Sequence, residues 1–184
     1  MHQSGEMRVE RVPASFVRRI VAFLIDGLAI AVVGFAVLAV ATVVLGPTVR
    51  LRLDAPEAPV AEVLGWRVIV NSALLFVVSA AYFVLSWSRF SFTPGQALLG
   101  LTVTSEPPDD RRALAVGPAT LRWALLGSPL GLAAALTVEA PLLFLAVAVL
   151  SFGWFAALIL TTLLSRNGRG LHDRLTGTTV IRRG

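Results

Sequence analysis

Long apolar runs constrain this chain more than any other feature of its sequence. The first extends from Ile20 to Leu45, the second from Val68 to Leu85, and the third from Trp123 to Leu164. A helix that crosses the roughly 30 Å hydrocarbon core of a bilayer needs about 20 mainly apolar residues. Runs of this length therefore predict an all-α integral membrane protein.

The composition supports the same class. Of the 184 residues, 56% are apolar and 15% charged, and the mean hydropathy is +0.79. An average soluble domain has about one quarter charged residues, and intrinsic disorder needs low hydrophobicity. One membrane unit without a large aqueous domain is expected. Cysteine is absent, which excludes disulfides, thiol catalysis and thiolate metal sites.

Breaks within the apolar regions set the number of spans. The first run is too long for a signal peptide and contains Asp26. The last region is too long for one helix and is interrupted by Glu139 and Pro141, which predicts a helical hairpin, with Pro129 marking a kink or a close helix contact. Whether its shorter arm crosses fully or re-enters is left open. The expected division is an N-terminal segment 1–18, a four-helix domain 19–164 with spans about 19–45, 66–87, 122–138 and 141–164, and a tail 165–184.

The connections differ in character. Residues 48–63 have no sustained apolar period, which predicts a short loop. Within the longer interval 88–122, the segment Leu101–Thr104 alternates briefly, and Thr178–Ile181 near the C terminus has a similar β-branched character. These two segments could pair as a small cytoplasmic β element at the membrane surface.

Arginine predicts the orientation. All 16 basic residues are Arg, and 13 of them fall in the N-terminal segment, the middle connection with its edges, and the tail, against three elsewhere. By the positive-inside rule, both termini are expected in the cytoplasm and the protein in the plasma (inner) membrane. Because the Arg residues flank apolar runs instead of forming a basic face, they predict contact with headgroups and not with nucleic acid.

Asp26 is the most informative residue, since a carboxylate inside a spanning helix costs a few kcal/mol and should face protein, water or a counter-ion. Arg19 lies two turns earlier on the same face, from which it could reach Asp26 or extend toward the headgroups. Four polar residues on the second helix could form a hydrogen bond with Asp26: Asn71, Ser72, Ser79 and Tyr82. Asp173, beyond the last helix, is expected on the same side of the membrane as Arg19. The chain could thus bring Arg19 and Asp173 together at the cytoplasmic boundary, with Asp26 deeper in the bundle.

Three motifs follow one another in order: Arg19-x-x-Ala22-x-x-Ile25-Asp26, Thr93-x-Gly95-x-x-Leu98-x-Gly100-Leu101-x-Val103 and Leu171-His172-Asp173-Arg174-x-x-x-Gly177-Thr178. Together they resemble the RDD family of bacterial membrane proteins, named for one arginine and two aspartates, over about residues 14–182. The resemblance implies a triad of Arg19, Asp26 and Asp173. Gly95, Gly100 and His172 are supporting candidates, together with Asn71. The role usually suggested for the family is transport of an unspecified ligand or ion.

Two functions remain open from the sequence. In the first, the chain is a transporter or ion-conducting subunit in which Asp26 titrates, Arg19 sets its charge and Asp173 acts at the cytoplasmic mouth. Four helices hardly enclose a pathway, so this function predicts a homo-oligomer or another membrane protein as partner. In the second, the chain is an accessory protein with the triad as a structural clamp. No catalytic motif is found, and no metal site or cofactor is expected.

Overall fold

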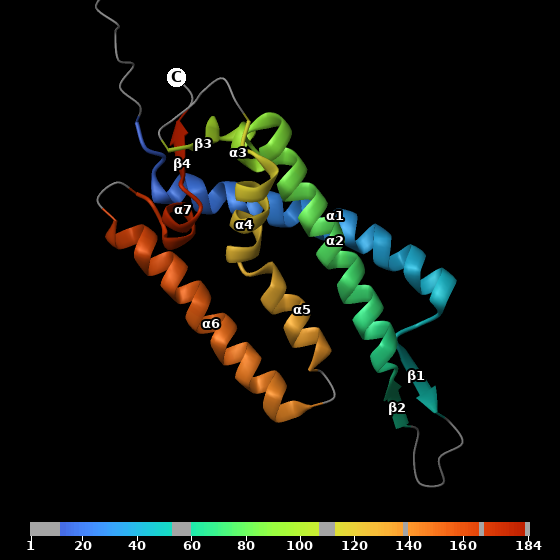
Figure 1. Cartoon of the computed structure of the whole chain (residues 1–184). Coiled ribbons are helices and arrows are strands. Elements are labelled where there is room, and N and C mark those ends of the chain that lie inside the picture. Colours follow the sequence, from blue (N-terminus) through green and yellow to red (C-terminus); the bar gives the residue numbers. More distant parts are fainter. Residues whose placement is uncertain (1–11, 53–59, 107–112, 138–139, 166–167, 183–184) are drawn as a thin grey trace, which may run out of the picture.

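The computed structural model describes residues 12–52, 60–106, 113–137, 140–165 and 168–182. The expected fold class is confirmed: these residues are mostly helical, with two small sheets (Figure 1). In chain order the elements are α1 (Phe16–Leu45), β1 (Val49–Arg52), β2 (Val60–Val63), α2 (Gly65–Phe90), α3 (Pro94–Leu98), β3 (Leu101–Ser105), α4 (Val116–Leu125), α5 (Ser128–Leu136), α6 (Pro141–Leu164), α7 (Leu171–Leu175) and β4 (Thr178–Arg182).

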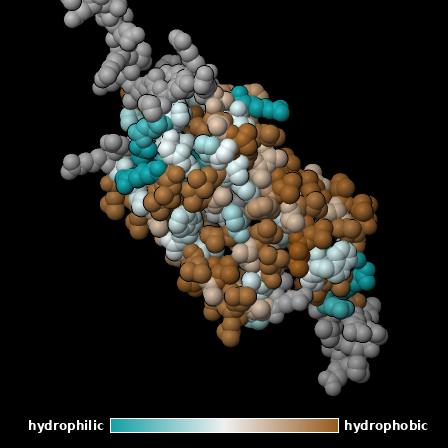
Figure 2. Space-filling view, viewed as in Figure 1, coloured by the Kyte–Doolittle hydropathy of each residue, from teal (hydrophilic) through white to brown (hydrophobic). Residues whose placement is uncertain are grey.

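The long helices have the apolar surface of membrane spans. Within the described part of the chain, α1, α2 and α6 are each long and apolar enough to cross a bilayer, and α4 with α5 forms a further candidate. Large apolar side chains such as Phe35 on α1 and Phe152 on α6 are exposed. Figure 2 shows these side chains covering the helical body, with hydrophilic ones gathered at its ends. The chain is therefore a multi-pass membrane protein in contact with lipid.

The third apolar segment differs from the expected helix over 122–138. It begins earlier, at Val116, and is divided into α4 and α5, which are bent by 52°. Gly127 ends α4, because its φ is positive at 98°. Pro129, in the first turn of α5, has no N–H to donate to a carbonyl of α4, so α4 cannot continue into α5 as a regular helix. The Phe155 ring of α6 lies where a side chain at residue 127 would be. Glu139, expected at the hairpin turn, lies outside the described residues.

The predicted pairing of the two β-branched segments is confirmed. β3 and β4 run antiparallel, with Val103 opposite Val180. The loop expected over 48–63 is wrong for the described residues, because β1 and β2 form an antiparallel ribbon in which Arg50 lies opposite Glu62. Residues 53–59 lie outside the described part of the chain. The four-residue strands are too short for their alternation to stand out from a loop, but opposite charges across a ribbon favour the pairing.

The best-packed core lies at one end of the helices. There, α3, β3, β4 and α7 gather against α1, α2 and α4, while the β1/β2 ribbon extends from the other end of α1 and α2 (Figure 1). Leu101 and Val103 are fully buried, and Trp87 nearly so, in a cluster that includes Trp123 and Val180. This closed end holds α7 in place and thereby positions Asp173.

Candidate functional site

Asp173 is the centre of a buried ion cluster. It lies in the first turn of α7 with its side chain fully buried. Its Oδ2 accepts a hydrogen bond from Arg19 Nη1 at 2.8 Å and from the Gly170 backbone N–H at 3.2 Å, and its Oδ1 pairs with Arg122 Nη1. One carboxylate thus joins α1, α4 and α7, three elements far apart in the sequence.

Arg19 turns toward Asp173 and not toward Asp26. Its Nη2 donates to the Val180 carbonyl of β4 at 3.0 Å, and its Nε donates to the Ala14 carbonyl at 3.3 Å. Among the described residues, the ion pairs of Arg19 do not include Asp26. The predicted meeting of Arg19 and Asp173 is therefore confirmed, because the tail folds back to the start of α1. The alternative in which Arg19 reaches Asp26 is not found among the described residues.

Arg122 belongs to the cluster, although sequence reasoning counted it only toward orientation. It is 3% exposed, and its Nη1 also donates to Thr178 Oγ1 at 2.6 Å. Its guanidinium carbon lies 5.3 Å from the centre of the Trp87 ring, within the range of a cation–π interaction. Its place directly before an apolar run is the signal that the sequence offers, and this place does not identify a carboxylate partner.

His172 lies beside the same carboxylate, with Nε2 3.3 Å from Asp173 Oδ1. Burial, followed by the charge of Arg122, lowers the pKa of His172 to about 4, so the imidazole is neutral at pH 7. Burial opposes ionisation of Asp173, but the positive neighbours, Arg122 foremost, hold its pKa well below the usual range. Two guanidinium groups against one carboxylate leave the cluster with one excess positive charge.

Asp26 occupies a separate polar position deeper along α1. It is 2% exposed and accepts hydrogen bonds from Tyr82 Oη at 2.7 Å, Thr93 Oγ1 at 2.5 Å and the Gly95 N–H at 2.8 Å. Tyr82 was one of the donors expected for this carboxylate. Asn71 instead donates to Thr48 Oγ1 at 3.1 Å, beside the β1/β2 ribbon, so it lies at the other end of the helices and is not part of this site.

The two glycines of the second motif have different conformational roles. A Cβ at Gly95 would collide with the Ala22 carbonyl and come within 2.9 Å of the Asp26 carboxyl group, so glycine permits α3 to lie against α1. Gly100 has a positive φ of 64° in the turn between α3 and β3. Gln96 closes a capping box with Thr93 and accepts a hydrogen bond from Trp87 Nε1 at 3.1 Å.

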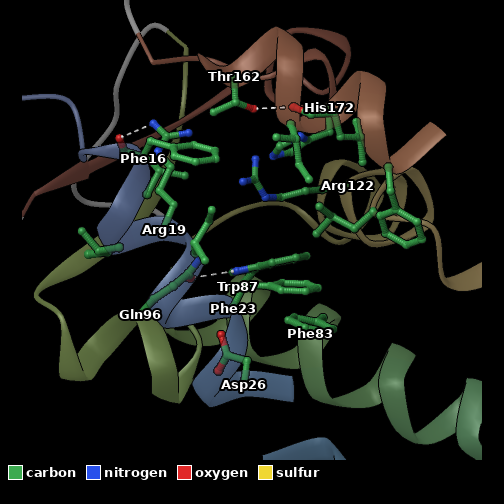
Figure 3. A pocket seen from close by; sticks show the side chains of 17 residues that line it. Phe16, Arg19, Phe23, Asp26, Phe83, Trp87, Gln96, Arg122, Thr162 and His172 are labelled. Carbon is green, nitrogen blue, oxygen red and sulfur yellow. Dashed lines mark hydrogen bonds between the residues drawn. The ribbon is translucent and has the colours of Figure 1, made fainter. Parts of the chain in front are cut away.

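One cavity of about 280 Å³ adjoins both polar positions (Figure 3). Its polar lining consists of Arg19, Asp26, Gln96, Arg122, Thr162 and His172, and apolar side chains make up the rest. Among the described residues, Arg122 Nε and His172 Nδ1, which belong to residues of this lining, are buried without a hydrogen-bond partner, as are Arg67 Nε and Arg169 Nε elsewhere. Within the described ranges, His, Asp and Glu form no group of three that could hold a metal ion.

The fold and site define a class: a multi-pass helical membrane protein with a buried Arg/Asp cluster at one end of its spans. The sequence profile of the RDD family matches residues 13–177, and the chain belongs to this family. Comparison with curated proteins and with solved structures gives no significant match.

Proposed function

We propose that this RDD-family protein is a membrane transport subunit that binds an anion in the cavity beside the Arg/Asp cluster. The observation that carries the proposal is that two guanidinium groups face one carboxylate in the cluster, and that the buried Arg122 Nε–H has no partner among the described residues. Asp26, which also lines the cavity, is bound by its own donors. Buried polar groups are nearly always hydrogen-bonded, and a charge-assisted bond to an anion is among the strongest that such a group can make.

The proposed roles follow from the contacts. Arg122 binds the anion, while Asp173 and Arg19 hold Arg122 in place and keep α7 closed over the end of the cavity. Asp26 has a positioning role: its donors on α2 and at the start of α3 bind its carboxylate from several sides. This assignment replaces the earlier hypothesis in which Asp26 is the titrating group.

The proposal includes orientation and assembly. In this proposal the end with α7 and β4 faces the cytoplasmic side of the plasma membrane, because most of the Arg residues that the structure describes lie at that end. A second copy or another membrane protein completes the pathway, since so few helices hardly enclose one. The proposed activity has no catalytic step and uses neither a cofactor nor nucleic acid.

A second candidate function is favoured because both carboxylates are bound by several hydrogen-bond or ion-pair donors. Asp26 and Asp173 each bind donors from separate elements, as a structural clamp would. In that case the protein is an accessory subunit that docks another membrane protein and moves no ligand itself. Buried ion pairs often fix which surfaces meet while adding little net stability.

Anion currents distinguish the two functions. Purified protein in proteoliposomes on a solid-supported membrane is exposed to chloride, phosphate, acetate and octyl sulfonate in turn. Transport predicts a current with at least one of these anions, its loss in Arg122→Gln, and its retention in Arg169→Gln. Arg169 is a suitable control because it pairs with the half-exposed Glu106 and does not line the cavity. If monodisperse wild-type protein gives no current with any of them, transport by the chain alone is wrong.

A further inference from the structure

The cavity is bounded on one side by side chains that are half-exposed on the lipid-facing helices. Phe23 on α1 is 49% exposed, and Phe155 and Ile159 on α6 are 41% and 47% exposed, yet all three line the cavity. These residues belong to the apolar belt of two candidate membrane spans. The cavity therefore lies beside hydrocarbon, and an apolar chain could enter it from the bilayer.

The polar floor complements a particular kind of headgroup. Arg122 Nε is a buried cationic donor without a partner, which calls for an anionic oxygen. His172 is neutral at pH 7, and its Nε2 lies 3.3 Å from the Asp173 carboxylate. We assign the ring proton to Nε2, because a carboxylate favours a donor beside it, and this makes Nδ1 an acceptor. A headgroup with both an anionic oxygen and a hydroxyl satisfies both atoms. A phosphate group supplies this pair when it is singly protonated or carries a hydroxylated substituent.

The volume limits how much of the ligand is enclosed. At about 280 Å³, the cavity is close to the lower end of the range of roughly 300–1,000 Å³ found for small-molecule sites. It can hold a headgroup and the beginning of one chain, while the remainder extends between α1 and α6 into the bilayer. A ligand divided in this way would have its charge on Arg122 and its chain beside Phe23 and Ile159.

We propose that the cavity binds a phosphate-headed lipid that enters from the surrounding bilayer between α1 and α6. The inference deepens the proposed function, on which it rests, by naming the class of anion. A phosphate-headed lipid and free phosphate would both place a phosphate oxygen on Arg122. Free phosphate, however, would leave the apolar walls of the cavity without a ligand.

Photolabelling in nanodiscs of zwitterionic lipid tests this inference. The probe is a long-chain alkyl phosphate with a diazirine on its chain, and the competitors are unlabelled alkyl phosphate, inorganic phosphate and the corresponding alcohol. Labelling should fall on α1 and α6 and be removed by alkyl phosphate, but not by inorganic phosphate or the alcohol. Ile159→Trp, which fills the cavity, should reduce labelling about tenfold. Leu160→Trp should not, because Leu160 is 54% exposed on the same helix but does not line the cavity.

Several other outcomes overturn the inference, and one separates it from the proposed function. Labelling that persists in Ile159→Trp places the probe elsewhere on the surface, and loss in both Trp variants shows a general effect on α6. Competition by inorganic phosphate alone identifies a free anion as the ligand, and competition by the alcohol shows that charge is not recognised.

If the probe labels the cavity but no anion current is measured, transport is wrong and the lipid site stands. If a current is measured without labelling, the ligand class is wrong and transport stands.

Discussion

At the scale of single residues, Asp173 joins separate elements of the closed end through Arg19, Arg122 and the Gly170 N–H. Its carboxylate is the shared partner of two buried guanidinium groups, on α1 and α4. Removing one member of a buried ion cluster leaves uncompensated charge, which typically costs about 3–5 kcal/mol. We expect Asp173→Asn to lower the free energy of unfolding by about this amount, measured by chemical or thermal unfolding in detergent.

An exposed ion pair in the same protein provides the matched control. Glu106 pairs with Arg169, but its side chain is 47% exposed. Exposed pairs contribute about 0–1 kcal/mol, so Glu106→Gln should change stability little. Equal losses in the two variants would show that Asp173 is not an energetic centre of the fold.

His172 gives the cluster a pH dependence. Burial, then Arg122, depresses the pKa of His172 from 6.5 to about 4. Between these values the unfolded state binds a proton that the folded state does not, so stability rises with pH over this window and is complete above about pH 6.5. The full difference is about 3 kcal/mol. Asp173, whose pKa is held below its usual range, adds a loss of stability only at lower pH.

Unfolding measured from pH 7.5 down to 4.5 checks this dependence. The wild type should lose stability steadily below about pH 6.5, whereas His172→Gln, which cannot titrate, should show a much flatter profile over the same range. Parallel profiles would mean that another group causes the change.

At the scale of elements, the approach of α3 to α1 depends on the absence of a side chain at Gly95. A Cβ there would collide with the Ala22 carbonyl and crowd Asp26. Overpacking of a tight contact costs about 1–3 kcal/mol, and we expect Gly95→Ala to destabilise the protein by this amount in the same unfolding assay. Gly117→Ala is the control, because a Cβ at Gly117, near the start of α4, meets nothing within 4 Å. Equal stability of the two variants would contradict the close packing of α3.

The helices and strands also show which parts of the fold are determined by the local sequence. The long apolar runs specify spanning helices without help from the rest of the chain, because lipid leaves the backbone no other partner. The β3/β4 pair was predictable from two β-branched segments, whereas β1 and β2 were not, since their four residues each resemble a polar loop. The division between α4 and α5 depends on Gly127 making room for Phe155, a contact between separate helices.

At the scale of the whole molecule, the candidate site could be predicted only in part. The motifs brought Arg19, Asp26 and Asp173 to attention as one set, and their positions in the chain predicted that Arg19 and Asp173 meet while Asp26 lies deeper, which the ion cluster and the hydrogen bonds of Asp26 confirm. Helical spacing predicts which residues share one face of a helix, but it does not predict which distant segment packs against that face. The second guanidinium of the cluster, Arg122, comes from a part of the chain without a motif, so only the tertiary structure joins it to Asp173.

The absence of cysteine makes the orientation of the whole molecule testable residue by residue. Leu175 on α7 and Leu51 on β1 are both more than half exposed and lie at opposite ends of the helices. If the arginine-rich end is cytoplasmic, a membrane-impermeant maleimide should label Leu51→Cys in intact cells, and Leu175→Cys only after permeabilisation. The unmodified chain has no thiol and should remain unlabelled. The reverse pattern would invert the protein and place the Arg/Asp cluster at the outer surface, where a ligand would reach the cavity from the other leaflet.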